Sequence, residues 1–371
     1  MRVAIVHDWL TNLGGAERVV EAMLEAYPEA DLYTSVYDDR KLDLFRKHQV
    51  RTSFLQRVPL AKRKHQLFPI LRRYAFEAFD FSQYDVVITS STAEAKGVIT
   101  SEGTLHASYI NTPTRYYWSH YDEYLKSPGF GVLDPLVRWQ LERTIEANRR
   151  WDFAAAQRAD IVFGNSQTVV DRIEKYYQRK AQVLYPNVET HKFQQPQPRP
   201  SGLPEKYFLV VSRLIPYKRV DIAIEAAVMS GTPLVVIGSG GQLPELKKLA
   251  DDKVIFVGAL DDRSVVAHMQ HAEAFVFPGE EDFGITPVES MAAGVPVIGY
   301  ARGGVAETII DGETGILVDR QTATAFAKAF HRYQRSDYAA SALAAQAEKF
   351  RRERFITELR SSIDQALKQR V

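Results

Sequence analysis

The chain has 371 residues, of which 45% are hydrophobic and 25% are charged, and its net charge is +1. This length suffices for two domains with separate cores, and the near-neutral balance gives no support to a nucleic-acid partner. No cysteine is present, which excludes disulfides, thiolate metal sites and cysteine nucleophiles. The first apolar run is too short for a signal peptide and no run reaches about 18 residues, so we expect a cytoplasmic protein.

Short apolar runs rich in Val and Ile recur between helical stretches. They are residues 3–7, 84–91, 106–111, 159–166 and 181–188, followed by 207–213, 233–240, 253–260, 272–279 and 295–300. Strands that are apolar on both faces and alternate with helices indicate parallel sheets covered on both sides. Ten such strands exceed one small sheet, which predicts an α/β fold with two doubly wound, Rossmann-like domains.

A Pro/Gln-rich stretch separates the two sets of strands. We place an N-terminal domain at 1–191, a linker at 192–206, a C-terminal domain at 207–346 and an amphipathic helix at 347–371. Ligands of doubly wound sheets bind beyond the C-terminal ends of the strands. The predicted active site is therefore a cleft between the two domains, lined by both sets of strand ends.

Glycine-rich turns follow two of the predicted strands. Gly14 and Gly15 precede a helix, where they permit close backbone approach and offer a phosphate the positive end of that helix. The turn at 238–241 resembles half of a dinucleotide fingerprint, but Leu243 stands where the third glycine belongs. A nicotinamide site is therefore disfavoured.

Arg213 and Lys218 follow the end of the strand predicted at 207–213. They could be two solvated surface cations, but a strand end is where the cleft should lie. A guanidinium and an ammonium together suit a diphosphate. Enzymes of sugar nucleotides often hold the diphosphate through an Asp-x-Asp pair and a metal, and this sequence has no Asp-x-Asp. We expect the two cations to replace the metal.

Glu281 and Glu289 stand eight positions apart around Gly284. One reading is a capping box, in which Thr286 is the N-cap, Pro287 is the first helical residue and Glu289 reaches back to the N-cap. The other reading is a pair of carboxylates that hold hydroxyl groups of a nucleotide-sugar, while the helix after Gly284 faces its phosphates. Glu281 has no part in the capping box.

Together these motifs resemble the retaining GT-B glycosyltransferases of family 4, or group 1. The Glu-x7-Glu signature runs from Glu281 to Glu289, and the sequence "AAGVPVIGYARGGVAETIIDGETGILV" continues the resemblance through the C-terminal domain. The N-terminal stretches "HDWLTNLGGAERVVEAM" and "NTPTRYYW" are similar to bacterial mannosyltransferases that build O-antigen or exopolysaccharide units. The resemblance implies a hexosyltransferase that uses GDP-mannose, without a metal or other cofactor.

The resemblance also implies roles for individual residues. Arg213 and Lys218 would bind the donor diphosphate and act in catalysis together with Glu281 and Asn111. Leu260 would contact the base. The helix at 347–371 would cross back to the N-terminal domain. The remaining donor contacts are expected from Gly14, Gly15, Phe283, Gly284, Ile285 and Glu289.

Asn111 is a departure from the family pattern, because relatives commonly carry histidine in this "HTP" motif. Asparagine can hydrogen-bond a hydroxyl, but it cannot take a proton at neutral pH. This fits front-face displacement, in which the leaving phosphate oxygen accepts the acceptor's proton. His7, His106 and His120 are other nearby candidates, and Arg115 suits a phosphate of the acceptor.

Between Arg46 and Arg73 lie nine Lys and Arg residues and no acidic residue. This basic segment could be a solvated helix face or a patch for a polyanionic acceptor. It could also dock on anionic membrane, which would bring the enzyme to a polyprenyl-diphosphate-linked glycan. The apolar residues that would enter the headgroup region are Phe54, Leu55, Leu60, Leu67, Phe68 and Ile70.

Other classes of protein share parts of this pattern. A transferase could use a UDP- or ADP-sugar on a soluble acceptor. A non-catalytic two-lobed sugar-binding protein would have the same architecture, but it would need neither Arg213 with Lys218 nor a carboxylate for ribose. A phosphorylase or a sugar-nucleotide epimerase would share the phosphate chemistry.

Overall fold

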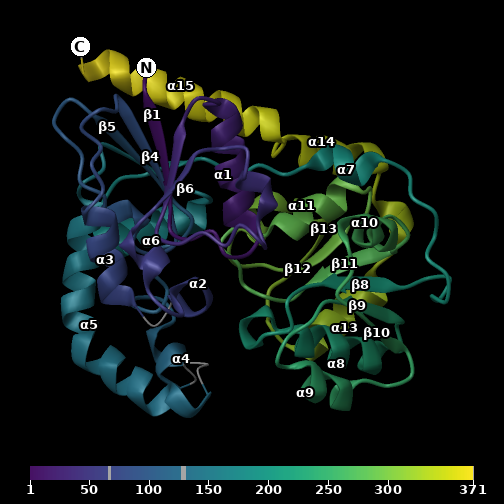
Figure 1. The fold of residues 1–371 in the computed structure, drawn as a ribbon. Coiled ribbons are helices and arrows are strands. Elements are labelled where there is room, and N and C mark those ends of the chain that lie inside the picture. Colours follow the sequence, from purple (N-terminus) through teal and green to yellow (C-terminus); the bar gives the residue numbers. More distant parts are fainter. Residues whose placement is uncertain (66–67, 127–130, 371) are drawn as a thin grey trace. The chain divides into compact units, whose positions relative to one another are not determined.

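The computed structural model describes residues 1–65, 68–126 and 131–370, and the chain divides into two compact units. The first unit comprises Met1–Tyr185 and Phe355–Val371, and the second comprises Pro186–Arg354. Each unit is built on a parallel sheet flanked by helices (Figure 1). The fold class predicted from the sequence, two doubly wound Rossmann-like domains, is therefore confirmed.

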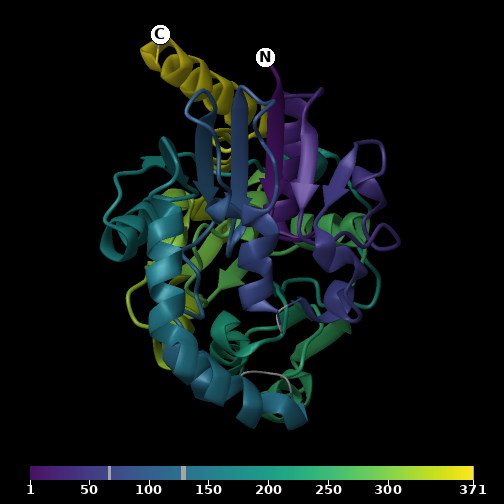
Figure 2. The same cartoon turned by 60° about the vertical axis from the view of Figure 1, so that its left-hand side comes forward.

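The sheet of the first unit has the strand order β3-β2-β1-β4-β5-β6-β7. All its neighbouring strands pair in parallel, and Figure 2 shows several of them side by side in purple and blue. The order reverses between β1 and β4, which is where such sheets bind ligands. The strands are β1 (Val3–His7), β2 (Asp31–Thr34), β3 (Val50–Thr52), β4 (Val86–Ser91), β5 (Leu105–Ile110), β6 (Ile161–Gly164) and β7 (Gln182–Val183).

Helices cover both faces of this sheet. Residues of α15 from Phe355 onward belong to the first unit, although α15 begins three residues earlier. The helices are α1 (Gly15–Ala26), α2 (Ala61–Lys64), α3 (Pro69–Glu77), α4 (Tyr121–Lys126), α5 (Asp134–Ala156), α6 (Gln167–Tyr177) and α15 (Arg352–Arg370). Short 3-10 turns are η1 (Asp43–Phe45), η2 (Phe54–Arg57), η4 (Ala95–Gly97) and η5 (Gly131–Leu133).

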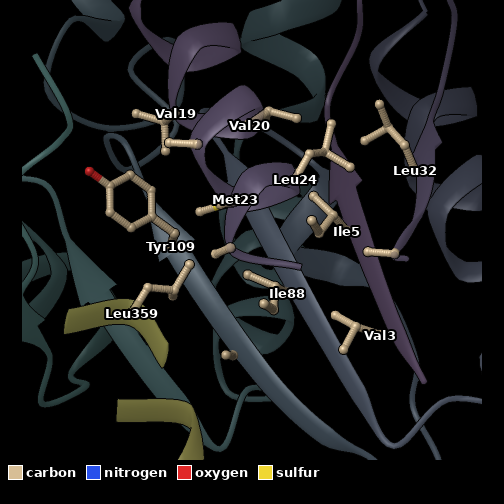
Figure 3. Packing of buried hydrophobic residues seen from close by; sticks show 14 of the residues in the cluster. Val3, Ile5, Val19, Val20, Met23, Leu24, Leu32, Ile88, Tyr109 and Leu359 are labelled. Carbon is tan, nitrogen blue, oxygen red and sulfur yellow. The ribbon is translucent and has the colours of Figure 1, made fainter. Parts of the chain in front are cut away.

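The core of the first unit follows from the alternation of side chains along β1. Val3 and Ile5 pack with α1 and α15 on one face, while Ala4 and Val6 pack on the other face with α3. Figure 3 shows side chains of α1 and α15 gathered over the strands on the first face. Phe355, Leu359 and Ile363 of α15 are fully buried there. Each such side chain stabilises the packing by about 1.5–3 kcal/mol.

The sheet of the second unit has the order β10-β9-β8-β11-β12-β13, again all parallel. It repeats the topology of the first sheet, with the reversal of strand order between β8 and β11. The strands are β8 (Phe208–Val211), β9 (Leu234–Ile237), β10 (Val254–Gly258), β11 (Ala274–Phe277), β12 (Val297–Tyr300) and β13 (Gly315–Val318). The helices are α7 (Thr190–Gln194), α8 (Val220–Ser230), α9 (Leu243–Leu249), α10 (Asp262–Gln270), α11 (Ile285–Ala292), α12 (Val305–Thr308), α13 (Ala323–Arg332) and α14 (Ala340–Glu348), with the 3-10 turns η6 (Pro216–Lys218) and η7 (Arg335–Asp337).

Two details differ from the expected organisation. The first residues of the predicted linker 192–206 are helical in α7, which packs against α10 and α11 of the second unit. The predicted helix at 347–371 is instead the end of α14 followed by α15. Between the two helices, Val188 donates its N–H to the carbonyl of Phe350 and forms an isolated bridge with Arg351.

No helix in residues 1–65, 68–126 and 131–370 combines the length and apolar character that crossing a bilayer would need.

Candidate functional site

Lys218 and Glu281 meet at the reversal of strand order in the second unit. Lys218 ends η6, which follows β8, and Glu281 follows β11, so both lie beyond the C-terminal ends of adjacent strands. Nζ of Lys218 forms an ion pair with Oε1 of Glu281, and the side chains are 17% and 14% exposed. That carboxylate oxygen is therefore paired with an ammonium, and the two opposite charges are held together beyond the strand ends.

Close backbone contacts hold the Glu281 loop in place. Gly304 donates its N–H to the carbonyl of Glu281 at 2.9 Å, and Gly303 pairs with Glu281 as an isolated parallel bridge. Gly303 has a φ of +70°, and a Cβ there would collide with the Glu281 carbonyl. A Cβ on Gly279 would lie 3.1 Å from the carbonyl oxygen of Lys218. These glycines let the loops carrying the two charged residues approach each other.

Tyr217 contacts both Arg213 and Lys218, the two residues predicted to bind the diphosphate. Tyr217 was not identified from the sequence. Nη2 of Arg213 donates to the Tyr217 hydroxyl at 2.8 Å, and Nζ of Lys218 lies 5.4 Å from the centre of its ring. Nζ also lies 5.9 Å from the Phe277 ring, so two aromatic faces flank the ammonium. Arg213 is exposed, and the structure gives it no direct contact with Lys218 or Glu281 among the described residues. A tyrosine directly before Lys218 was the signal available in the sequence.

The capping box predicted at Thr286 is wrong. Helix α11 begins at Ile285, its N-cap is Gly284 with a φ of +84°, and no side chain caps it. Pro287 is therefore the third helical residue, and Glu289 lies a turn into the helix, too far along to reach an N-cap. Glycine adopts this left-handed conformation without the strain that a Cβ brings. No acidic residue lies in the first turn of α11, so the positive end of the helix meets no carboxylate from that turn.

Leu260 and Phe283 occupy different surroundings. Leu260 follows β10 and is half-buried, next to the register irregularity at Gly258, where φ is +78°. The ring of Phe283 is buried 5.4 Å from that of Phe350, so its side chain contributes to packing. The expected donor contacts of both residues stay predictions.

The glycine turn at 238–241 has a packing explanation. Gly238 has a φ of +141°, and a Cβ there would collide with the carbonyl of Ser212. A Cβ on Gly240 would collide with the carbonyl of Leu214. The turn therefore lies directly against the backbone that follows β8, and its glycines need no dinucleotide to account for them.

Asn111 and Arg115 lie beyond the end of β5 in the first unit. Nδ2 of Asn111 donates to Oγ of Ser90 at 3.1 Å and to the Ser91 carbonyl at 3.4 Å. Arg115 is half-buried in the turn that follows. That turn is anchored by Asp152, which accepts from Thr114 Oγ1 at 2.9 Å and from Trp118 Nε1 at 2.8 Å.

The predicted phosphate seat at the start of α1 already faces a carboxylate. Gly14 is the N-cap of α1 and Gly15 its first residue. Oε2 of Glu17 lies 3.0 Å from the point where a Cβ on Gly14 would stand. A phosphate bound at this helix end would lie close to that carboxylate, which opposes its binding. Glu17 was not singled out from the sequence, because a single acidic residue in the first turn of a helix is common and does not by itself indicate a function.

The basic segment, residues 46–73, contains several elements. Phe54, Leu60 and Ile70 are exposed, as expected for membrane contact. Leu55 is fully buried, so the expectation for Leu55 is wrong. Phe68 is half-buried against the same core cluster, so its membrane contact stays a prediction, and Leu67 lies outside the described residues.

The cations of the basic segment also differ in exposure. Arg72 is buried and binds Glu94 through Nε at 2.7 Å, whereas Arg57, Arg63 and Lys64 are exposed and Lys62 is half-exposed. Leu60 is 65% exposed and has a φ of +66°, an uncommon conformation for a residue with a branched side chain.

In residues 1–65, 68–126 and 131–370, no three His, Asp or Glu side chains are grouped so that they could hold a metal ion. Metal independence stays a prediction.

Residues 192–350 match the sequence family described as glycosyl transferases group 1. The matched region lies within the second unit and spans less than half of the chain. It contains the Lys218–Glu281 pair, Leu260, α11 and the Gly303–Gly304 turn.

Similar proteins extend the comparison. The chain is 28% identical to a GDP-mannose-dependent alpha-(1-6)-phosphatidylinositol monomannoside mannosyltransferase of Mycolicibacterium smegmatis, over 51% of this chain and 60% of that protein. It is 24% identical to alpha-1,3/1,6-mannosyltransferase ALG2 of Rhizomucor pusillus, over 86% of this chain and 80% of that protein. The crystal structure of Anabaena Alr3699/HepE in complex with UDP superimposes with a TM-score of 0.71 and 18% identity, over 98% of this chain and 100% of that one. The fold of this chain is GT-B.

Proposed function

We propose that the chain is a retaining, metal-independent hexosyltransferase of family 4 that transfers mannose from GDP-mannose to a glycan acceptor. The observation that carries this proposal is the Lys218–Glu281 pair at the reversal of strand order in the region that matches group 1 glycosyl transferases. Lys218 would hold the diphosphate and Glu281 a hydroxyl of the transferred sugar. The mannosyltransferases among the relatives support mannose, and the UDP complex of the HepE structure favours a UDP-sugar as the second candidate donor.

The proposed chemistry needs no side-chain base. The acceptor oxygen forms a bond to the anomeric carbon while the bond from that carbon to the diphosphate oxygen breaks. The acceptor's hydroxyl proton passes to the leaving diphosphate oxygen, on the same face, so the configuration is retained. Asn111 would position the acceptor hydroxyl, because its amide hydrogen-bonds but does not take a proton at neutral pH.

The donor is expected to be revealed by thermal unfolding. At a concentration of 100 Kd a ligand stabilises the native state by about 2.7 kcal/mol, so GDP and GDP-mannose should raise Tm above the values with UDP, ADP and dTDP conjugates. Transfer of labelled mannose, measured with and without acceptor, then separates a transferase from a sugar-binding protein and from an epimerase. Stabilisation by UDP conjugates alone would contradict GDP-mannose, and a bound but unreacted donor would contradict the transferase.

Metal removal is expected to leave the activity unchanged, because Lys218 and the N-terminus of α11 would neutralise the diphosphate. Transfer should continue at the same rate in excess EDTA. Lys218→Ala should weaken GDP binding roughly ten- to a hundredfold, the range for losing a charged hydrogen bond. The control is Lys247→Ala, which removes an exposed cation of α9. Activity that depends strictly on Mg²⁺ or Mn²⁺ would overturn this part of the proposal.

The proposed acceptor is a polyprenyl-diphosphate-linked glycan at the surface of anionic membrane, reached by peripheral contact from the cytoplasm. The exposed cations and apolar side chains of the basic segment support membrane contact, and Arg115 suits the diphosphate of such an acceptor. Products of this kind belong to cell-surface polysaccharides such as O-antigen. A soluble acceptor is the alternative, and liposome binding distinguishes the two.

A further inference from the structure

His7 is a buried histidine at the C-terminal end of β1, beside the reversal of strand order in the first unit. It is 2% exposed. Its Nδ1 lies 3.0 Å from the carbonyl oxygen of Ser90, and because a carbonyl only accepts, Nδ1 carries the proton. Its Nε2 lies 3.8 Å from Oε1 of Glu17, which is itself 5% exposed. A second proton on Nε2 would therefore face a carboxylate in a dry environment.

Two carboxylates act on His7, and only one is free to serve as its counter-ion. The Asp8 carboxylate accepts hydrogen bonds from the N–H groups of Thr92 at 2.6 Å, Ala93 at 3.0 Å and Ala95 at 2.7 Å. It is therefore occupied in holding the turn after β4. Glu17, on α1, is left to balance a charge on His7.

The charged form of His7 is favoured in the folded protein. Burial lowers the pKa of His7, but the Glu17 carboxylate, the charge of Asp8 and the Ser90 carbonyl outweigh burial, so the pKa lies above its ordinary value. Protonated His7 then prevails below that raised pKa and is lost as the pH rises through it.

The pair lies between the start of α1 and Asn111. Glu17 lies in the first turn of α1, where its Oε2 stands against Gly14. On the other side, Ser90 accepts from His7 through its carbonyl and from Asn111 through its hydroxyl at 3.1 Å. The contacts thus run from Glu17, in the first turn of α1, through His7 and Ser90 to the amide of Asn111.

We propose that His7 and Glu17 are positioning residues, and that the protonated pair holds the glycine turn of α1 and the Asn111 amide in the geometry that transfer requires. The proposal deepens the proposed function, since its catalytic readout assumes the transferase. Stability alone gives little reason for the pair, because a buried ion pair is often no more stabilising than apolar residues of the same size. The position of the pair at the C-terminal end of β1, beside the reversal of strand order, gives a functional reason for it.

The test compares Glu17→Gln with the matched control Glu25→Gln, which removes an exposed carboxylate from the same helix. Side-chain NMR follows the His7 imidazole and the Asn111 amide through a pH titration, without any substrate. In the wild type the Asn111 amide should titrate together with His7. In Glu17→Gln both transitions should move to lower pH, while Glu25→Gln should match the wild type.

Turnover gives the second readout. The alkaline fall of kcat should move to lower pH in Glu17→Gln, so that at pH values above the wild-type pKa of His7 kcat drops roughly tenfold for each unit by which that pKa falls. In His7→Gln, whose amide cannot titrate, that alkaline fall should disappear. An Asn111 amide that ignores the His7 titration would overturn the proposal, and so would a kcat profile that stays in place while the His7 pKa falls. If the wild type transfers no sugar, the proposed function fails, and the NMR titration still decides the coupling.

Discussion

Replacing Glu281 by glutamine is expected to lower kcat at least about a hundredfold, the scale seen when one preorganised transition-state interaction is lost. Glutamine keeps the shape of the side chain but removes its charge, so it holds a sugar hydroxyl less strongly as positive charge develops on the sugar. Lys218 stays in place to bind the diphosphate. The dissociation constant for GDP should therefore change far less than kcat, as measured by calorimetry beside a steady-state transfer assay.

The neighbouring Glu280→Gln is the matched control for Glu281→Gln. Glu280 is exposed in the same loop, so its removal changes the net charge equally without touching the Lys218 pair. We expect Glu280→Gln to retain near wild-type kcat, and both variants to unfold cooperatively near the wild-type Tm. A folded Glu281→Gln protein with near wild-type kcat would remove Glu281 from the reaction, whatever the donor proves to be.

The sequence predicted the strands with the strongest apolar character. Strand β1 has the predicted bounds, β5 is shifted by one residue from its predicted range, and the other eight predicted strands are present but shorter. Their ends were overestimated because polar residues at the C-terminal ends, such as Ser212 and Arg213, look like continuations of the strand while they form the loops of the site.

Three strands were missed because their own sequences are weak. Strand β3 has three residues and one exposed cation, β2 begins with Asp31, and β13 follows the turn residues of "DGETG". Their structure depends on pairing with other strands. Strand β2 lies between β1 and β3, and β13 is the edge strand that pairs with β12. Short segments of this kind gain their stability from the neighbouring strand more than from their own propensity.

Side-chain partners were harder to predict than positions. Lys218 and Glu281 are 63 positions apart by their residue numbers. Only the strand order, which places β8 beside β11, shows that the two residues follow neighbouring strands. The capping box failed for a backbone reason, since Gly284 ends the loop in a conformation that makes it the N-cap itself. The spacing of His7 and Glu17 matches no known motif, so nothing in the sequence indicated that these two side chains would pair.

The wild-type protein is expected to float with liposomes that contain anionic lipid. Phe54, Leu60 and Tyr74 expose 46%, 65% and 61% of their surfaces, beside the cations of α2. Leucine at position 60 is held in a left-handed conformation that costs about 1–2 kcal/mol, which is a reason to look for a function in its exposed side chain. The apolar side chains would enter the headgroup region while the cations meet anionic lipid.

Reversing the charges of Lys62, Arg63 and Lys64 to glutamate should abolish this flotation. Each cation near an anionic surface contributes on the order of 1 kcal/mol, so losing three of them weakens binding by about a hundredfold before repulsion is added. Binding of the wild type should also fall as salt increases, because salt screens these charges. The control reverses Lys247, Lys248 and Arg332, which are exposed in the second unit and change the net charge equally.

A second variant separates the apolar contribution from the electrostatic one. Leu60→Gly with Phe54→Ser removes two exposed apolar side chains, keeps every charge and relieves the left-handed strain at position 60. If the apolar side chains enter the headgroup region, this variant should bind anionic liposomes more weakly than the wild type while its Tm does not fall. Unchanged flotation would reduce the contact to charge attraction alone. A wild-type protein that stays in the soluble fraction at low salt would exclude membrane docking, and the proposed acceptor would then be a soluble glycan.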